Sequence, residues 1–169
     1  MRTVGVILAI VAAVVLQTTL GRYIARATVA VDLVLVVVVA VALTCGPVTG
    51  LLTGTAAGLA QDALSSGVLG IGGLAKTLVG FLVGIVGSQF IVAQPFSRFV
   101  VFLAATALHA AVFIGLYVML DLRQFGTSYA AVGGQAVGNA VVGVVVFQLG
   151  EFLPGVVERR RSQRARIRR

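Results

Sequence analysis

The sequence predicts an all-α polytopic membrane protein with about six transmembrane helices in one compact bundle. Of the 169 residues, 59% are hydrophobic and only 11% are charged, and the mean hydropathy is +1.10. A soluble domain has about a quarter of its residues charged, so five acidic and thirteen basic residues cannot cover a globule of this size. Seven of the basic residues lie in the last eleven positions. We therefore expect one integral membrane domain over residues 1–157 and a cytoplasmic arginine-rich tail over 158–169.

Six apolar stretches, separated by short polar or turn-forming breaks, are the predicted spans. They cover residues of about 4–21, 28–44, 47–64, 69–91, 98–120 and 129–150. All three prolines fall at predicted helix boundaries, where a missing N–H does least harm. With about 17 residues each, the second and third spans cover about 25 Å of a hydrocarbon core that is nearer 30 Å. Five spans therefore remain an alternative to six.

The first span follows Arg2 and is an uninterrupted apolar run as far as Leu16. It resembles a secretory signal peptide, but five more apolar stretches follow and nothing is left over for an exported domain, so we expect an uncleaved first helix. The second span is aliphatic and ends at Cys45, Gly46 and Pro47. Because Cys45 is the only cysteine, one chain cannot form a disulfide framework or a thiolate metal cluster.

Glycine recurs at every fourth position of the third span, and the fourth and sixth spans contain glycines at similar spacing. The glycines of this pattern are Gly46, Gly50, Gly54, Gly58, Gly72, Gly80, Gly84, Gly134 and Gly138. Helices in lipid gain little from burying apolar surface, and small residues let their backbones approach closely. We interpret the pattern as packing between helices of one chain, with dimerisation or docking of a partner helix as the alternative.

Asp62 in the third span and Lys76 in the fourth are the only opposite charges inside adjacent predicted spans. Ionisable residues within a membrane are costly unless they are paired or face a wet cavity. By helical rise, Lys76 lies about 10 Å along its span, within reach of Asp62 if its side chain extends toward the water. The sequence therefore predicts an intramembrane ion pair between Asp62 and Lys76, with a structural role favoured over ligand binding.

The fifth and sixth spans contribute three further polar side chains, His109, Gln135 and Asn139. Gln135 and Asn139 lie one helical turn apart. These groups either form hydrogen bonds between helices or line an outward-facing pocket together with Lys76. We favour hydrogen bonding between helices, since each such contact contributes about 0.6 to 2 kcal/mol in a membrane.

The basic tail and the basic residues beside the spans predict the orientation. The tail arginines are Arg159, Arg160, Arg161, Arg164, Arg166, Arg168 and Arg169. With six spans and both termini in the cytoplasm, nine arginines flank the spans inside and three outside. A polybasic segment next to a membrane helix binds anionic lipids, so the tail is expected to contact lipids or a cytoplasmic partner rather than nucleic acid.

Catalytic motifs are missing from the sequence. It contains no HExxH, no GxSxG and no phosphate-binding loop that ends in Gly-Lys-Ser/Thr. Nor does it contain a close pair of carboxylates that could share acid and base roles. We therefore expect a protein that is not an enzyme, without catalytic residues, cofactor or metal site.

Several short motifs resemble a known family. Asp32-Leu33 opens the aliphatic second span, Gly46-Pro47 forms the next turn, and the segment GLAQDALSSGVLG covers residues 58–70. Together with the length and hydropathy of the chain, these motifs resemble the rod shape-determining protein MreD of the bacterial cytoplasmic membrane.

The resemblance implies a non-enzymatic scaffold of the bacterial elongation complex, which determines cell shape through peptidoglycan synthesis. It implies MreC as the main partner, with MreB, RodA and a class B penicillin-binding transpeptidase in the same complex. The family is also similar in fold to the substrate-binding subunits of energy-coupling-factor transporters, which have six helices and an outward-facing pocket. Binding of a vitamin by such a subunit is therefore the alternative function.

Overall fold

The computed structural model describes residues 2–24, 31–65, 68–90, 94–121 and 129–167, and the side chains of 4–19, 31–65, 68–90, 94–121 and 130–150. Every regular secondary-structure element in this part of the chain is a helix, as the sequence predicts. The helices are α1 (Arg2–Ile24), α2 (Leu33–Cys45), α3 (Pro47–Leu64), α4 (Ile71–Gln89), α5 (Pro95–Met119) and α6 (Tyr129–Ile167).

Three of the described helical segments are long and apolar enough to cross a membrane: α4, α5 and residues Ala130–Gly150 of α6. They fit a membrane protein. Helix α2 has only 13 residues, which is about 20 Å. It is shorter than the predicted span 28–44 because Asp32 forms its N-terminal cap, where the carboxylate accepts a hydrogen bond from the Leu35 N–H at 3.0 Å. Six crossings remain a prediction.

Helix α2 lies in the centre of the bundle and contacts each of the other five helices. Its residues are apolar on every side, which is typical of a helix that is buried all round. Leu35, Val36 and Val39 are at most 1% exposed and pack in one core with Val79 of α4 and Phe102 of α5. The short central helix is therefore enclosed by protein.

Helices α3 and α4 approach each other backbone to backbone through their glycines. A Cβ atom at Gly54 would overlap the backbone carbonyl of Lys76, and one at Gly58 would lie 2.6 Å from the Cα of Gly73. The contact is reciprocal, because a Cβ at Gly80 would overlap the carbonyl oxygen of Gly50. The two helices are therefore too close for any side chain at these positions.

Gly46, the first glycine of the predicted pattern, belongs to a turn and not to a helix face. It follows α2 with φ +87°, and a Cβ added there would meet no atom within 4 Å. Its positive φ is a conformation that glycine adopts without strain. Gly46 therefore permits the sharp reversal between α2 and α3, and its lack of a side chain is not needed for packing space.

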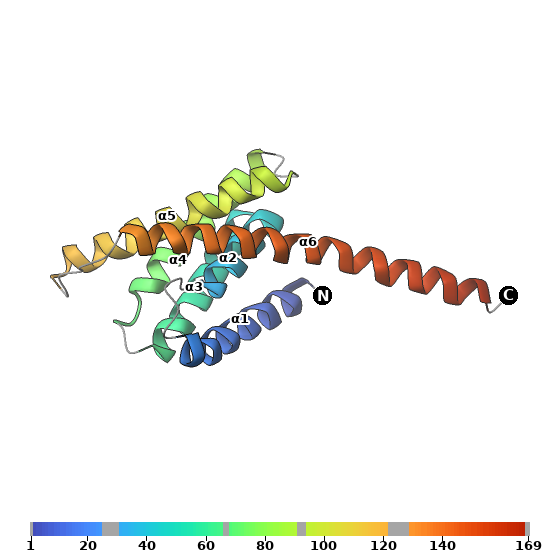
Figure 1. The fold of residues 1–169 in the computed structure, drawn as a ribbon, viewed down its shortest axis with the longest axis horizontal. Coiled ribbons are helices and arrows are strands. Elements are labelled where there is room, and N and C mark those ends of the chain that lie inside the picture. Colours follow the sequence, from blue (N-terminus) through green and yellow to red (C-terminus); the bar gives the residue numbers. More distant parts are fainter. Residues whose placement is uncertain (1, 25–30, 66–67, 91–93, 122–128, 168–169) are drawn as a thin grey trace.

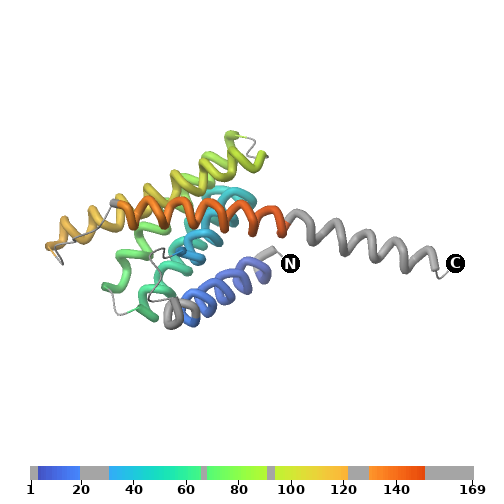
Figure 2. The backbone as a smooth tube through the Cα atoms, viewed as in Figure 1, coloured from blue at the N-terminus to red at the C-terminus, as the bar shows by residue number. Residues whose placement is uncertain are grey.

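The outer helices divide into two groups. Helices α5 and α6 lie alongside one another, and α1 contacts only α2 and α3 among the described elements (Figure 1). The backbone trace shows α1, in blue, well apart from α5 (Figure 2). A glycine again permits a close approach between α5 and α6, because a Cβ at Gly143 would lie about 2.5 Å from the Phe102 ring.

Candidate functional site

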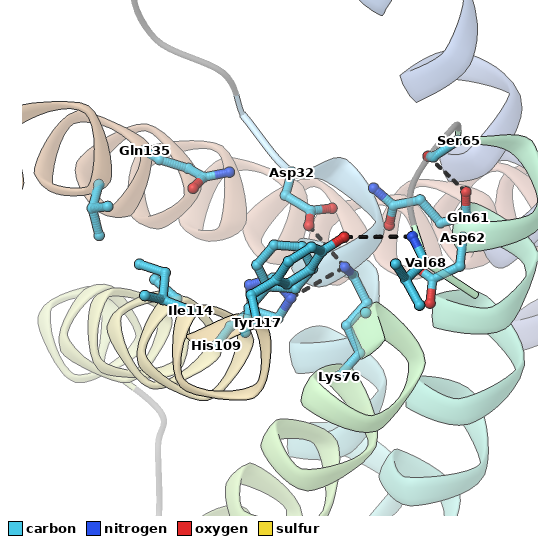
Figure 3. Close-up of a pocket in the computed structure, with 14 residues that line it drawn as sticks. Asp32, Gln61, Asp62, Ser65, Val68, Lys76, His109, Ile114, Tyr117 and Gln135 are labelled. Atoms are coloured by element: carbon cyan, nitrogen blue, oxygen red, sulfur yellow. Dashed lines mark hydrogen bonds and ion pairs between the residues drawn. The ribbon is translucent and has the colours of Figure 1, made fainter. Parts of the chain in front are cut away.

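A cavity of about 320 Å³ lies at one end of the bundle, among α2, α3, α4, α5 and α6. It is lined by Asp32, Gln61, Asp62, Ser65, Val68, Gly72, Lys76, His109, Ala110, Phe113, Ile114, Tyr117, Val132 and Gln135. Figure 3 shows Lys76 and Asp32 between Gln135 on one side and Gln61 with Asp62 on the other.

The buried charge of this cavity is an ion pair between Lys76 and Asp32. The Nζ of Lys76 lies 3.0 Å from Oδ2 of Asp32, and the two side chains are 4% and 7% exposed. The same Nζ lies 3.3 Å from Nε2 of His109 (Figure 3). An ammonium has only donors, so it donates to Nε2 and the imidazole is neutral in this arrangement. The three side chains therefore join α2, α4 and α5.

This pairing corrects the predicted partner of Lys76, which was Asp62. Gly54 of α3 packs directly on the Lys76 backbone, while the Lys76 side chain reaches the N-terminal end of α2, where Asp32 lies. Sequence reasoning considered only adjacent predicted spans. It overlooked Asp32 because the second span, which contains this residue, is not adjacent to the fourth span, which contains Lys76.

Asp62 instead forms hydrogen bonds with backbone N–H groups at the start of α4. Its Oδ2 accepts hydrogen bonds from the N–H groups of Gly70 at 2.9 Å and Gly73 at 3.0 Å. Gly70 is the N-terminal cap residue of α4 and has φ +102°. The first N–H groups of a helix have no partner within it and carry partial positive charge. The Asp62 carboxylate therefore caps α4 from the end of α3.

Asn139 lies behind the ion pair and does not line the cavity. It is fully buried, its Oδ1 accepts the N–H of Asp32 at 2.8 Å, and its Nδ2 donates to Oγ1 of Thr106 at 3.2 Å. Of the four residues of the predicted pocket, Lys76, His109 and Gln135 line the cavity, whereas Asn139 forms hydrogen bonds among α2, α5 and α6. These residues therefore both line a cavity and form hydrogen bonds between helices, and the outward orientation of the pocket stays a prediction.

One wall of the cavity is aromatic. His109, Phe113 and Tyr117 follow one another at intervals of four residues on α5, with ring centroids 5.8 Å and 4.8 Å apart. The hydroxyl oxygen of Tyr117 accepts the N–H of Val68 at 3.4 Å. Sequence reasoning missed this wall, although the i, i+4, i+8 spacing on a helix places such residues on one face.

Gln61 brings an unsatisfied acceptor to the same cavity. Its Oε1 is buried and has no hydrogen-bond partner in the described residues. Buried polar atoms nearly always have a partner, so such an exception points to a missing one. Ser65 lies beside it and donates its hydroxyl to the Gln61 backbone carbonyl, not to the side chain (Figure 3).

The other predicted residues lie away from the cavity. Gly134 and Gly138 of α6 are half-buried. Arg98 is one of the nine arginines predicted to flank the spans on the cytoplasmic side; it is 5% exposed, with its guanidinium 4.1 Å from the centre of the Phe147 ring. The side chains of the tail arginines (159, 160, 161, 164, 166, 168 and 169) lie outside the described residues.

The geometry provides a cavity for binding and a network of contacts that fixes the helices. The described residues contain no group of three or more His, Cys, Asp or Glu side chains that could hold a metal ion. Apolar helices arranged around a buried ion pair define a helical membrane protein with a charged internal cavity.

The family follows from comparison of the whole sequence. The family model of the rod shape-determining protein MreD matches residues 1–153, and the chain belongs to this family. The resemblance inferred from the motifs is thus confirmed, and membership implies a role in rod-shape determination. No curated protein and no solved structure matches the chain, so similarity to the energy-coupling-factor subunits stays a prediction.

Proposed function

We propose that this protein is a non-enzymatic membrane scaffold of the bacterial elongation complex, acting in cell shape and peptidoglycan synthesis. The match to the MreD family over residues 1–153 carries the proposal. The geometry supports it, because the closest contacts serve to fix helices: glycines join α3 to α4, and the buried group around Asp32 joins α2, α4 and α6. A rigid bundle of this kind offers fixed surfaces to other membrane helices.

The proposed partner is MreC, with MreB, RodA and a class B penicillin-binding transpeptidase in the same complex. Co-purification tests this directly. The tagged chain is expressed with MreC from the same cell and, in parallel, with an unrelated single-pass membrane protein, and each pair is extracted in mild detergent. We expect a stable complex with MreC alone, of fixed stoichiometry in size-exclusion chromatography. A folded chain that elutes without MreC would contradict the proposal.

We further propose that all six helices cross the membrane and that both termini are cytoplasmic. Under this topology the start of α2, the end of α3 and the start of α4 share the outer side, and the cavity residues Asp32, Asp62 and Lys76 lie there. The tail arginines then lie at the cytoplasmic surface, where each would gain about 1 kcal/mol from anionic lipids.

The cavity supports one alternative, a substrate-binding subunit of an energy-coupling-factor transporter. Its volume of about 320 Å³ and its aromatic wall of His109, Phe113 and Tyr117 favour this reading. Mass spectrometry of the denatured protein, after purification from native membranes, separates the two functions. A vitamin retained at a one-to-one ratio, with no MreC complex, would favour the transporter subunit.

A further inference from the structure

The charges of the described ionisable groups around the cavity do not cancel. Asp32 and Lys76 neutralise each other at 3.0 Å, and His109 is neutral where it accepts from Lys76. Asp62 is left over, because no cationic side chain in the described residues forms an ion pair with it. The N-terminus of α4 offsets about half an elementary charge. Within the described residues, the cavity therefore carries uncompensated negative charge.

The same cavity contains hydrogen-bond acceptors that have no donor among the described residues, together with an aromatic face. Both hydrogen bonds that Asp62 accepts go to its Oδ2, and Oε1 of Gln61 has no partner in the part of the chain that the structure describes. The rings of Phe113 and Tyr117, with centroids 4.8 Å apart, line the same cavity. Carboxylates bind ammonium and guanidinium groups through charge-assisted hydrogen bonds, and aromatic faces attract the same cations.

The size of the cavity restricts the ligand further. A volume of 320 Å³ equals that of about ten water molecules, at about 30 Å³ each. This is too large for a single metal ion, and a cluster of metal-ligating side chains is missing from the described residues. It suits an organic molecule or side chain with a short apolar stem, which Ile114 and Val132 would contact.

We infer that this cavity binds an organic monocation, a primary ammonium or a guanidinium group on a short apolar stem. The cation lies among Asp62, Gln61 and Phe113, which all line the cavity. The donor is either a small free amine or a lysine or arginine side chain of another polypeptide. The inference goes beyond the scaffold function and does not depend on the binding of MreC.

A pair of isosteric probes tests the charge requirement. The full chain is placed in nanodiscs of zwitterionic phosphatidylcholine, which do not concentrate cations at their surface. Nα-acetyl-arginine amide is then compared with Nα-acetyl-citrulline amide, which has nearly the same shape and no charge. Binding is measured as the concentration-dependent rise in the thermal unfolding midpoint. We expect a saturable rise with the arginine compound and at least about tenfold weaker binding of the citrulline compound.

Variants locate the binding to the cavity. Asp62→Asn is expected to raise the dissociation constant of the arginine compound at least about tenfold. Asp121→Asn is the matched control, because Asp121 is exposed and lies outside the cavity, and it should bind as the wild type does. Phe113→Leu removes the aromatic face without removing a hydrogen bond and should weaken binding several-fold. This variant keeps the test valid if Asp62→Asn fails to fold.

Two measurements distinguish a free amine from a side chain of another polypeptide as the source of the cation. A stoichiometric amine in the mass spectrum of protein purified from native membranes identifies a free molecule. If no amine is retained while the arginine compound binds, the source is a side chain of another polypeptide. The inference is overturned if folded wild-type protein shows no saturable binding, if both probes bind equally, or if Asp62→Asn and Phe113→Leu bind as Asp121→Asn does. None of these results bears on co-purification with MreC.

Discussion

Asp32 has interaction partners on three helices at once. Its carboxylate accepts from Leu35 of its own helix and pairs with Lys76, while its backbone N–H donates to Asn139. A buried ion pair adds little net stability, yet removing one partner is costly because the other charge is left unpaired. The stability of the protein should therefore be sensitive to single changes at these residues and less so to paired ones.

The variant Lys76→Met should lose about 3–5 kcal/mol of unfolding free energy, because it leaves the buried Asp32 carboxylate without a counter-charge. Unfolding is followed in detergent by circular dichroism. Adding Asp32→Asn should recover part of the loss, so the two changes are not additive. The control cycle combines Lys76→Met with Asp62→Asn and should be additive within about 0.5 kcal/mol. Strong coupling in the control and none with Asp32 would contradict the observed pairing.

Asn139 supplies a second prediction at the residue scale. Asn139→Ala leaves the buried N–H of Asp32 without an acceptor, which should destabilise the protein by about 1–3 kcal/mol. Gln135→Ala is the matched control, since Gln135 lies one turn away on α6, is only half-buried and faces the cavity. Its effect should stay within about 0.5 kcal/mol. Equal losses for the two variants in chemical unfolding would show that Asn139 contributes no more than its neighbour.

At the scale of elements, α3 and α4 form the most closely packed pair. Gly50, Gly54 and Gly58 place the α3 backbone directly on that of α4. In water a glycine within a helix costs about 1 kcal/mol relative to alanine, but an inserted helix keeps its backbone hydrogen bonds for lack of water. Close contact then outweighs propensity, because small residues drive helix association in lipid.

The variant Gly54→Ala should destabilise the protein by at least about 2 kcal/mol, because its methyl group would meet the rigid Lys76 backbone and push the helices apart. Gly115→Ala on α5 is the matched control, since a Cβ there meets nothing within 4 Å. It should change stability by less than about 0.5 kcal/mol. Thermal unfolding in detergent measures both, and similar midpoints for the two variants would show that α3 and α4 can separate without cost.

At the scale of the whole molecule, the cavity gathers residues from equivalent ends of the helices. Asp32 precedes α2, Asp62 lies in the last turn of α3, and Gly72 lies at the start of α4. The reversal at Gly46 and the exposed thiol of Cys45 belong to the opposite end of α2 and α3. If every helix crosses the membrane, these two ends face opposite compartments.

The single cysteine makes this topology testable. With cytoplasmic termini and six crossings, Cys45 should react with a membrane-impermeant maleimide in inverted vesicles and not in intact spheroplasts. In a Cys45→Ala background, Ser65→Cys should show the reverse pattern, because Ser65 is exposed at the other end of α3. Labelling of both positions from the same side would contradict six crossings.

The sequence predicted those parts of the molecule that depend on local pattern. Apolar runs located all six helices, and the boundaries of α3 agree with the predicted 47–64. Pro47 and Pro95 begin α3 and α5 as predicted, whereas the boundary predicted at Pro154 is wrong, because α6 continues through it to Ile167. Side-chain pairs that depend on the tertiary arrangement could not be predicted in the same way. Asp62 and Asp32 are both acidic residues near helix ends, and only the packing of the helices decides which of them pairs with Lys76. The aromatic wall on α5 lacked a distinguishing signal, because aromatic residues at helical spacing are also common in apolar spans.

The enclosed position of α2 determines how the chain can enter the membrane. When α2 leaves the ribosome, neither long-range partner of Asp32, Lys76 or Asn139, has been synthesised. Asn139 lies 107 positions further along the chain. A short helix with a bare carboxylate at its end is poorly suited to diffuse into lipid alone. Helices α1 and α2 should therefore stay with the insertion machinery until α4 has been synthesised and Lys76 can pair with Asp32. Chains truncated before that point should be removed by membrane proteases.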